Sequence, residues 1–357
     1  MNFVRKKIKN ILVKLDRIIS SLYFKEHNHA VKLFHQEQTP FINSTTNGYP
    51  NKVIASFLFF NQIPQTEYAY ELNGKNYIEP HSGWILDSTK RKCFKFSFPY
   101  KELSKAPSFF KINCKSYKIV EYEKVISIRY YFFNYWHFIN DVLGQIALIS
   151  NFESDLNIPI LVPQGALSIP YVKSIIDSSK SLSSRKWIEL SEDTMILASK
   201  IIVAKNLPNT RDNILRAYDL MECENFPSPT QLDRKIFMTR ANHLKRSISN
   251  YVEIENLMKQ LGYEIIDNSV LSFSEQVKIY REASIVVGIH GAGLTNLIFR
   301  YPLRLKFIEI FPADLIPPHY YWLCNQLGFD YDCILGASMV DERFYLDPES
   351  VIKKLYS

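Results

Sequence analysis

The stretch Ser284-Ile-Val-Val-Gly-Ile-His-Gly-Ala-Gly-Leu-Thr-Asn296 joins a short apolar segment directly to a glycine-rich turn and the start of a helix. Its β-branched beginning is typical of a strand that is buried on both faces of a parallel sheet, and His290 stands at the carboxyl end of that strand. Gly291 and Gly293 let a ligand approach the backbone, and free N–H groups of a helix that starts near Leu294 favour an anion. The stretch therefore predicts an α/β fold with a phosphate-binding turn.

The glycine spacing, Gly288-x-x-Gly291-x-Gly293, matches neither the dinucleotide fingerprint G-x-G-x-x-G nor the P-loop. It disfavours a dehydrogenase and an ATPase. An alternative is that the glycines only allow close packing between strand and helix. The position of His290 favours a ligand site, because open α/β sheets bind ligands outside the carboxyl ends of their strands.

Length and composition point to a globular chain of two domains. The chain has 357 residues, of which 46% are hydrophobic. Its five cysteines are odd in number and form no C-x-x-C pair, which favours reduced thiols in a cytosolic setting and no zinc site.

The basic charge is concentrated at the amino terminus. Residues 1–25 contain seven basic side chains and one acidic one, which is +6 of the chain's net +7, so a basic body that binds nucleic acid is not expected. Apolar residues recur there at helical spacing, which predicts a basic amphipathic helix. No apolar run is long enough to span a membrane, and charges interrupt any signal-peptide core. The helix either docks on an anionic membrane surface or packs on its own domain.

The rest of the chain reads as an irregular part up to about residue 120, followed by alternating strands and helices. A strand at 124–131, a long helix at 134–153 and further elements at 158–162, 171–179 and 199–204 come first. A proline-rich break at 226–230 is the expected domain boundary, followed by strands at 235–239, 263–267, 284–289 and 305–311 and helices at 250–261, 272–283 and 319–327. We therefore expect an amino-terminal helix (1–25), a first domain (26–228), a second domain with a parallel sheet (229–340) and a closing helix (341–357).

The carboxyl-terminal half resembles family 61 glycosyltransferases, which include the EGF-domain O-GlcNAc transferase, an O-mannose-linked GlcNAc transferase and plant xylan-decorating enzymes. The resemblance extends from about Ile236 to Pro312, with an Asn-Tyr-x-His element at 134–137. The residues that carry it are Thr239-Arg240, Lys245-Arg246, Asn250, the strand up to Asp267, Ser272 to Gln276, Val287 to Asn296 and Phe307 to Pro312.

The resemblance implies a GT-B-like fold, in which two Rossmann-like domains with parallel sheets face a cleft. It also implies an inverting transfer from a nucleotide-diphospho-sugar, usually UDP-linked, without a required metal or other cofactor. The residues that it assigns to donor binding are Arg240, Arg246, His290, Gly291, Ala292, Gly293, Leu294 and Thr295 for the diphosphate, and Glu309 for the ribose hydroxyls. Arginine forks suit phosphate oxygens, and a carboxylate suits a diol.

The helix predicted at 134–153 is apolar apart from one stripe that contains Asn134, His137, Asp141 and Gly144/Gln145. At a spacing of four residues, Asp141 can orient the imidazole of His137 and raise its basicity. Together with the family resemblance, this pattern makes His137 and Asp141 the catalytic candidates, with His137 as the general base. The alternative is a structural His–Asp pair in the core.

Asp330-Tyr-Asp332 matches the D-x-D pattern of metal-dependent glycosyltransferases. It lies after a helix and before a strand, at the amino edge of the expected sheet and away from the ligand crevice, and is read as a solvated turn.

We expect a glycosyltransferase that moves a sugar from a nucleotide-diphospho-sugar, UDP-linked, to a glycan or lipid-linked glycan, as in capsule or lipopolysaccharide synthesis. Because the sequence lacks a lumenal anchor and a disulfide pattern, a bacterial, cytoplasmic enzyme at the inner membrane face is expected. The alternative is a non-catalytic nucleotide-sugar-binding subunit.

Overall fold

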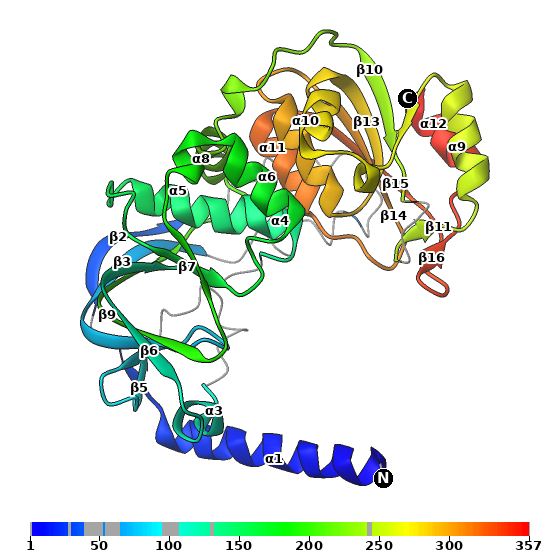
Figure 1. The fold of residues 1–357 in the computed structure, drawn as a ribbon. Coiled ribbons are helices and arrows are strands. Elements are labelled where there is room, and N and C mark those ends of the chain that lie inside the picture. Colours follow the sequence, from blue (N-terminus) through cyan, green and yellow to red (C-terminus); the bar gives the residue numbers. More distant parts are fainter. Residues whose placement is uncertain are drawn as a thin grey trace. The chain divides into compact units, whose positions relative to one another are not determined.

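The computed structural model describes residues 2–27, 30–38, 53, 65–94, 107–128, 132–240 and 245–356. The chain divides into two compact units (Figure 1). The first contains residues 1–37, 66–133 and 141–206, and the second contains residues 38–65, 134–140 and 207–357. The expected boundary near residue 228 stays a prediction.

The described residues of the first unit form a mixed sheet. Its order is β1-β5-β4-β3-β9-β6-β7-β8, and β2 pairs with β3. The strands are β1 (Lys25–His27), β2 (Val31–Gln38), β3 (Gln65–Ile78), β4 (Ile85–Asp87), β5 (Lys92–Phe94), β6 (Lys118–Ser127), β7 (Ile160–Pro163), β8 (Trp187–Leu190) and β9 (Thr194–Lys205).

The expectation of a fully parallel first sheet is wrong. Strands β6, β7, β8 and β9 pair in parallel, but β3 runs antiparallel to β4 and β9, and β4 runs antiparallel to β5. For the pairs β3–β4 and β4–β5 the reason is local, since only short turns connect these strands and a parallel crossover needs a much longer connection. In the second of these turns, Asp87 accepts hydrogen bonds from the backbone N–H groups of Arg91 (3.1 Å) and Lys92 (3.0 Å).

Helix α1 (Asn2–Tyr23) packs on the short helix α3 (Phe109–Asn113) along one side. Ser20 Oγ accepts from the backbone N–H of Phe109 (3.0 Å), and Asp16 accepts from that of Phe110 (3.2 Å). The predicted amphipathic helix is confirmed as a helix. None of the helices in the described ranges is long and apolar enough to cross a bilayer.

The region predicted as one helix at 134–153 contains three segments. They are α4 (Tyr135–His137), the π-helical segment η3 (Phe138–Leu143) and α5 (Gly144–Ser150). The remaining helices of the first unit are α6 (Pro170–Ser178) and α7 (Lys180–Ser183). Since a π-helix is bonded from residue i to i+5, the expected four-residue spacing between His137 and Asp141 no longer defines one turn.

The second unit contains a fully parallel sheet of five strands in its described residues, as predicted for this half of the chain (Figure 1). The order is β12-β10-β13-β14-β15, made of β10 (Arg234–Met238), β12 (Glu264–Ile266), β13 (Ala283–Ile289), β14 (Lys306–Phe311) and β15 (Asp330–Leu335). A separate pair joins β11 (Ser247–Ile248) to β16 (Arg343–Phe344). In chain order this is 2-1-3-4-5, a doubly wound arrangement whose switch point lies between β10 and β13.

Two helical segments, α8 (Arg211–Leu220) and η4 (Cys223–Asn225), precede the first strand of this sheet. Helices follow its strands as the alternating pattern predicts, and they are α9 (Tyr251–Gln260), η5 (Asn268–Val270), α10 (Phe273–Glu282), η6 (Ala292–Arg300), α11 (His319–Leu327) and α12 (Pro348–Leu355). Ser272 forms a capping box with Glu275 at the start of α10, and Asp347 caps α12 by accepting from the backbone N–H groups of Glu349 and Ser350. Asn250 does not cap α9. Its amide instead donates to Glu253 (2.8 Å) and to the carbonyl of Leu346 (2.9 Å).

Two smaller expectations have clear outcomes. Asp330-Tyr-Asp332 begins strand β15 at its amino end, so the predicted location is right, but the residues form a strand and not a turn. Asp332 accepts a hydrogen bond from Lys354 (2.8 Å). All five cysteines are free thiols. The strand-like segment at 55–60 lies outside the described residues.

Candidate functional site

The switch point of the parallel sheet brings two predicted site segments together. Strand β10 is followed by Arg240, and its neighbour β13 is followed by His290 and Gly291. Met238 pairs with Gly288 in the register of these two strands, so both segments leave the sheet at the same edge. This edge is where doubly wound folds bind ligands.

Arg240 lies directly against the glycine turn. A Cβ added at Gly291 would overlap the guanidinium of Arg240. The backbone of Gly291 is extended, with φ 173°, which any residue can adopt. Glycine is therefore required here for the close approach of Arg240 and not for an unusual backbone conformation.

Two arginines give this edge its positive charge. Burial, and then the neighbouring Arg246, lower the pKa of Arg240 to about 10, so Arg240 remains charged at neutral pH. Arg240 Nη2 donates to the carbonyl of Lys245 (3.3 Å), and the backbone N–H of Arg246 donates to the carbonyl of Glu342 (2.7 Å). An anion that binds between the two positive charges reduces the repulsion between them.

The glycine turn starts a 3-10 helix, η6, at Ala292, two residues before the expected start near Leu294. The backbone N–H of Leu294 donates to the carbonyl of Gly291 (3.0 Å), and Thr295 Oγ1 donates to the carbonyl of Ala292 (2.6 Å). Those two donors are used within the turn itself. Asn268, which follows β12, donates to the carbonyl of Gly293 (3.2 Å) and holds the turn from the other side.

His290 and Glu309 form a buried pair. Nδ1 of His290 lies 2.5 Å from Oε1 of Glu309, and the Tyr331 hydroxyl donates to Oε2 of Glu309 (2.8 Å). Burial lowers the pKa of His290 and raises the pKa of Glu309, which favours a neutral imidazole beside a protonated carboxyl. Glu309 has no exposed surface. The predicted role of Glu309 toward ribose stays a prediction, since both oxygens already have protein partners.

Helix α4 is attached to the glycine-turn helix by hydrogen bonds. The Tyr135 hydroxyl donates to Oδ1 of Asn296 (2.5 Å), and the Asn296 amide donates to Gln276 (2.7 Å). Gln276 in turn donates to the carbonyl of Asn268 (3.0 Å). This network runs from the residue two positions before His137 to the loop that supports Gly293.

The two catalytic candidates lie on the same helical region. Asn134 caps α4 by accepting from the backbone N–H of His137 (3.3 Å), and Asp141 is buried in η3. His137 is partly exposed, and after burial it is the second cause of the lowered pKa of His319. π-Helical segments occur often at functional sites, which agrees with the assignment. The roles of His137 and Asp141 stay predictions.

Two residues at this edge, Asn268 and His319, were not predicted from the sequence. Arg240 Nε, Asn268 Oδ1 and His319 Nδ1 are buried and have no hydrogen-bond partner among the described residues. Most buried polar atoms in proteins are paired, so three unpaired atoms beside one turn indicate a polar ligand. Asn268 and His319 could have been identified by marking every polar residue that follows the carboxyl end of a predicted parallel strand.

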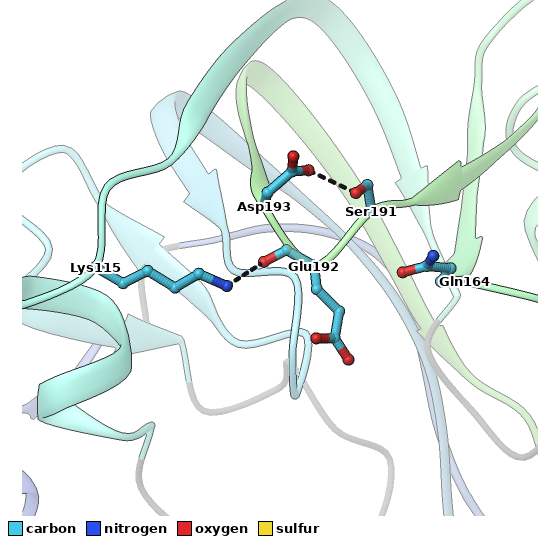
Figure 2. A pocket seen from close by; sticks show the side chains of 5 residues that line it. All are labelled: Lys115, Gln164, Ser191, Glu192 and Asp193. Atoms are coloured by element: carbon cyan, nitrogen blue, oxygen red, sulfur yellow. Dashed lines mark hydrogen bonds between the residues drawn. The ribbon is translucent and has the colours of Figure 1, made fainter.

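A different hollow lies in the first unit. Figure 2 shows it, a cavity of about 520 Å³ lined by Lys115, Gln164, Ser191, Glu192 and Asp193. Its polar groups are satisfied locally, because Lys115 donates to the carbonyl of Glu192 (3.0 Å) and Ser191 donates to Asp193 (2.5 Å). It contains none of the predicted site residues, and its exposed lining gives no reason to bind a nucleotide.

Comparison with known proteins finds plant glycosyltransferases that match parts of the chain. Over 85 residues the chain is 32% identical to a beta-1,2-xylosyltransferase of Arabidopsis thaliana, a match that covers 24% of this chain and 15% of the relative. Over 73 residues it is 34% identical to an alpha-1,3-arabinosyltransferase of Oryza sativa subsp. japonica, which covers 20% of this chain and 12% of the relative. A beta-1,2-xylosyltransferase of the same rice is 34% identical over 64 residues, or 18% and 12% of the two chains. The chain thus matches only a small part of these relatives.

The family model of glycosyltransferase 61 matches residues 135–305. The matched region contains both catalytic candidates, Arg240, Arg246 and the whole glycine turn, while Glu309 and His319 lie just beyond it. This match, over just under half of the chain, identifies residues 135–305 as a glycosyltransferase family 61 region.

Proposed function

We propose that the chain is an inverting glycosyltransferase that uses a nucleotide-diphospho-sugar, UDP-linked, in a GT-B-like arrangement. The observation that carries this proposal is the contact of Arg240 with Gly291 at the switch point of the parallel sheet. A partly buried guanidinium that lies against a glycine turn, with a buried Nε that has no partner among the described residues, is suited to a phosphate group. The family match supplies the reaction class.

On the donor side, the charge that develops on the leaving diphosphate is stabilised by cations. Arg240 and Arg246 carry fixed positive charge, and the glycine turn places backbone next to the same position. Preorganised donors of this kind stabilise a developing anion without reorganisation. They fill the role that a divalent cation has in metal-dependent transferases, which is why the transfer is proposed to be metal-independent.

His290 contributes as a neutral donor held by Glu309. The carboxyl of Glu309 fixes one ring nitrogen of His290, so the other is directed away from the carboxyl. In this proposal Glu309 acts through His290. A direct bond between Glu309 and ribose would require the carboxylate to exchange the partners that it has in the structure.

On the acceptor side, His137 accepts the proton from the acceptor hydroxyl as that oxygen attacks the anomeric carbon, and Asp141 fixes the imidazole tautomer. The glycosidic bond to the diphosphate breaks as the new bond forms on the opposite face, which inverts the anomeric configuration. The network from Tyr135 through Asn296 to Gln276 supports this assignment, because it couples α4 to the donor turn. The acceptor is a glycan or a lipid-linked glycan, with capsule or lipopolysaccharide synthesis as the proposed setting.

Helix α1 is proposed to place the enzyme on an anionic membrane, at the cytoplasmic face. Ile11, Leu15, Ile18 and Leu22 form one stripe at helical spacing, and each is exposed, Leu22 by 78%. Asp16 is turned toward α3, where it accepts a backbone hydrogen bond. The exposed charged residues of α1 are then basic, which complements an anionic surface.

The proposal is tested with a thermal-shift panel of nucleotides and nucleotide-sugars, with and without EDTA. A ligand present at about 100 times its Kd adds about 2.7 kcal/mol to the free energy of unfolding. UDP or a UDP-sugar should raise the melting temperature, and EDTA should leave the increase unchanged. Stabilisation by NAD alone would contradict the proposal. Binding of a nucleotide-sugar without transfer to any acceptor would favour the alternative, a non-catalytic binding subunit.

A further inference from the structure

His319 occupies a position that the proposed mechanism does not yet use. It is the first residue of α11, and the segment from Pro312 to Pro318 leads to it from the carboxyl end of β14. Its ring lies 6.3 Å from that of His290, with 29° between the ring planes, and 5.5 Å from that of Trp136. His319 therefore lies at the ligand-binding edge of the sheet, between the donor turn and α4.

The imidazole of His319 has an unused nitrogen. Nδ1 is buried, and no group in the described part of the chain forms a hydrogen bond with it. A buried donor or acceptor without a partner is unfavourable, and native proteins keep such atoms mainly where a ligand or an ion completes the bond. The packing of Trp136 and His290 against the ring fixes its orientation.

The charges around His290 indicate what that ligand is. Burial lowers the pKa of His290, and the positive charges of Arg246 and Arg240 lower it further, as a protonated His319 also does. Burial, and then His137, lower the pKa of His319 itself to about 4, so its imidazole is neutral near pH 7 and one ring nitrogen carries a hydrogen. Two arginines and a neutral imidazole N–H around one position favour an anion with several acceptor oxygens. A phosphate fits this description, and an acceptor hydroxyl does not.

We propose that Nδ1–H of His319 donates a hydrogen bond to a phosphate oxygen of the donor's diphosphate, on the side of His290 away from Arg240. His319 is then a donor-binding residue that follows β14, as Arg240 follows β10 and His290 follows β13. The inference rests on the proposed function, because it requires the glycine turn to hold a diphosphate. With His319, residues that follow three strands of the sheet contribute to the phosphate site.

The test compares two substitutions at His319 by calorimetric titration with inorganic pyrophosphate and with UDP. His319→Phe fills the space but removes the donor, and affinity for both probes should fall by about 10–100-fold. His319→Asn keeps an amide N–H close to the position of Nδ1, and most of the affinity should remain. A purely structural role would make both variants less stable and leave the affinity of the folded fraction unchanged.

His81→Phe is the matched control, since His81 also has a buried ring nitrogen without a partner in the described residues but belongs to the first unit. It should bind both probes as the unchanged protein does. Equal affinities of His319→Phe and the unchanged protein would overturn the inference and leave the proposed function standing. Loss of pyrophosphate binding in His319→Phe, in a protein that binds no UDP or nucleotide-sugar, would support the phosphate contact and contradict the proposed function. Failure of the unchanged protein to bind either probe would overturn both.

Discussion

The guanidinium of Arg240 occupies the space that a side chain at Gly291 would need. Because the backbone of Gly291 is extended, alanine fits its conformation, and only the arginine has to move. Gly291→Ala should therefore preserve the fold and weaken UDP binding by displacing Arg240. The loss should approach that of Arg240→Ala, about 1.5–3 kcal/mol for hydrogen bonds to a charged group. Calorimetric titration with UDP measures both values.

A double-mutant cycle provides the control for this prediction. If Gly291→Ala acts through Arg240, it should have little further effect in an Arg240→Ala background, because residues in contact give non-additive changes. Additive losses would mean that Gly291 contributes to binding independently of Arg240.

The hydroxyl of Tyr135 should matter for turnover more than for donor binding. Tyr135→Phe removes the bond to Asn296 that joins α4 to the glycine-turn helix, so His137 is held less precisely. We expect kcat to fall and the Kd for UDP to change little. Tyr218→Phe is a suitable control, since its hydroxyl also donates within the second unit, to the carbonyl of Tyr301 (3.0 Å). An equal fall in kcat for both variants would contradict a specific role for Tyr135.

The sequence predicted the second unit well, because alternating strands and helices with capping residues define a parallel sheet locally. The strand before His290 and the helix at 319–327 agree closely with β13 and α11. The first unit was predicted less well, since the direction of β3 relative to β9 depends on pairing between distant segments, which periodicity does not record. The π-helical segment at 138–143 was missed for a related reason, as an apolar helix carries no local signal for a change in hydrogen bonding.

The candidate site was predicted in part. Glycine spacing and resemblance identified Arg240 and His290, but not their partners. His319 and Tyr331 are brought to His290 and Glu309 by the order of strands β13, β14 and β15, which the sequence does not state.

The stability of the protein should fall as the pH is lowered from about 6.5 to 4. His319 has a pKa of about 4 in the folded protein, against 6.5 in the unfolded chain. Between these values the unfolded chain binds more protons, so the free energy of unfolding decreases with falling pH, by roughly 3 kcal/mol for a shift of this size. Urea denaturation at several pH values measures the slope.

His319→Phe should reduce this slope. The neutral pair of His290 and Glu309 holds one proton, and the same two residues hold one proton when unfolded between about pH 4.5 and 6.5. The pair therefore contributes nothing to the change of the free energy of unfolding with pH in that range. The same pH dependence in the variant and in the unchanged protein would show that folding does not lower the pKa of His319.

The exposed stripe of α1 should mediate binding to anionic vesicles. Ile18 is 58% exposed, and Ile18→Glu places a negative charge within the stripe, so sedimentation with phosphatidylglycerol vesicles should decrease. Val13 is also exposed but lies off the stripe at helical spacing, so Val13→Glu serves as a control with the same change in charge. Added salt should weaken binding of the unchanged protein. Equal losses in both variants would indicate a general charge effect and not an apolar contact.

The assignment of His137 as general base makes the sharpest prediction about chemistry. His137→Ala should lower turnover by about 10²–10⁴-fold, because the acceptor hydroxyl loses its proton acceptor during attack. UDP affinity should change little, since the proposed donor contacts come from the residues that follow β10, β13 and β14. Rates with a saturating UDP-sugar, together with titration of UDP, separate the two effects.

Asp141→Asn distinguishes a catalytic pair from a structural one. The amide keeps the size of the buried side chain but cannot stabilise an imidazolium, so turnover should fall by less than in His137→Ala, with the melting temperature nearly unchanged. The π-helical hydrogen bonding of η3 places Asp141 differently from the regular helix that the sequence predicts, and this variant tests whether the two side chains still act together. If His137→Ala unfolds the protein while its folded fraction keeps normal specific activity, then His137 is structural and the proton acceptor is another group.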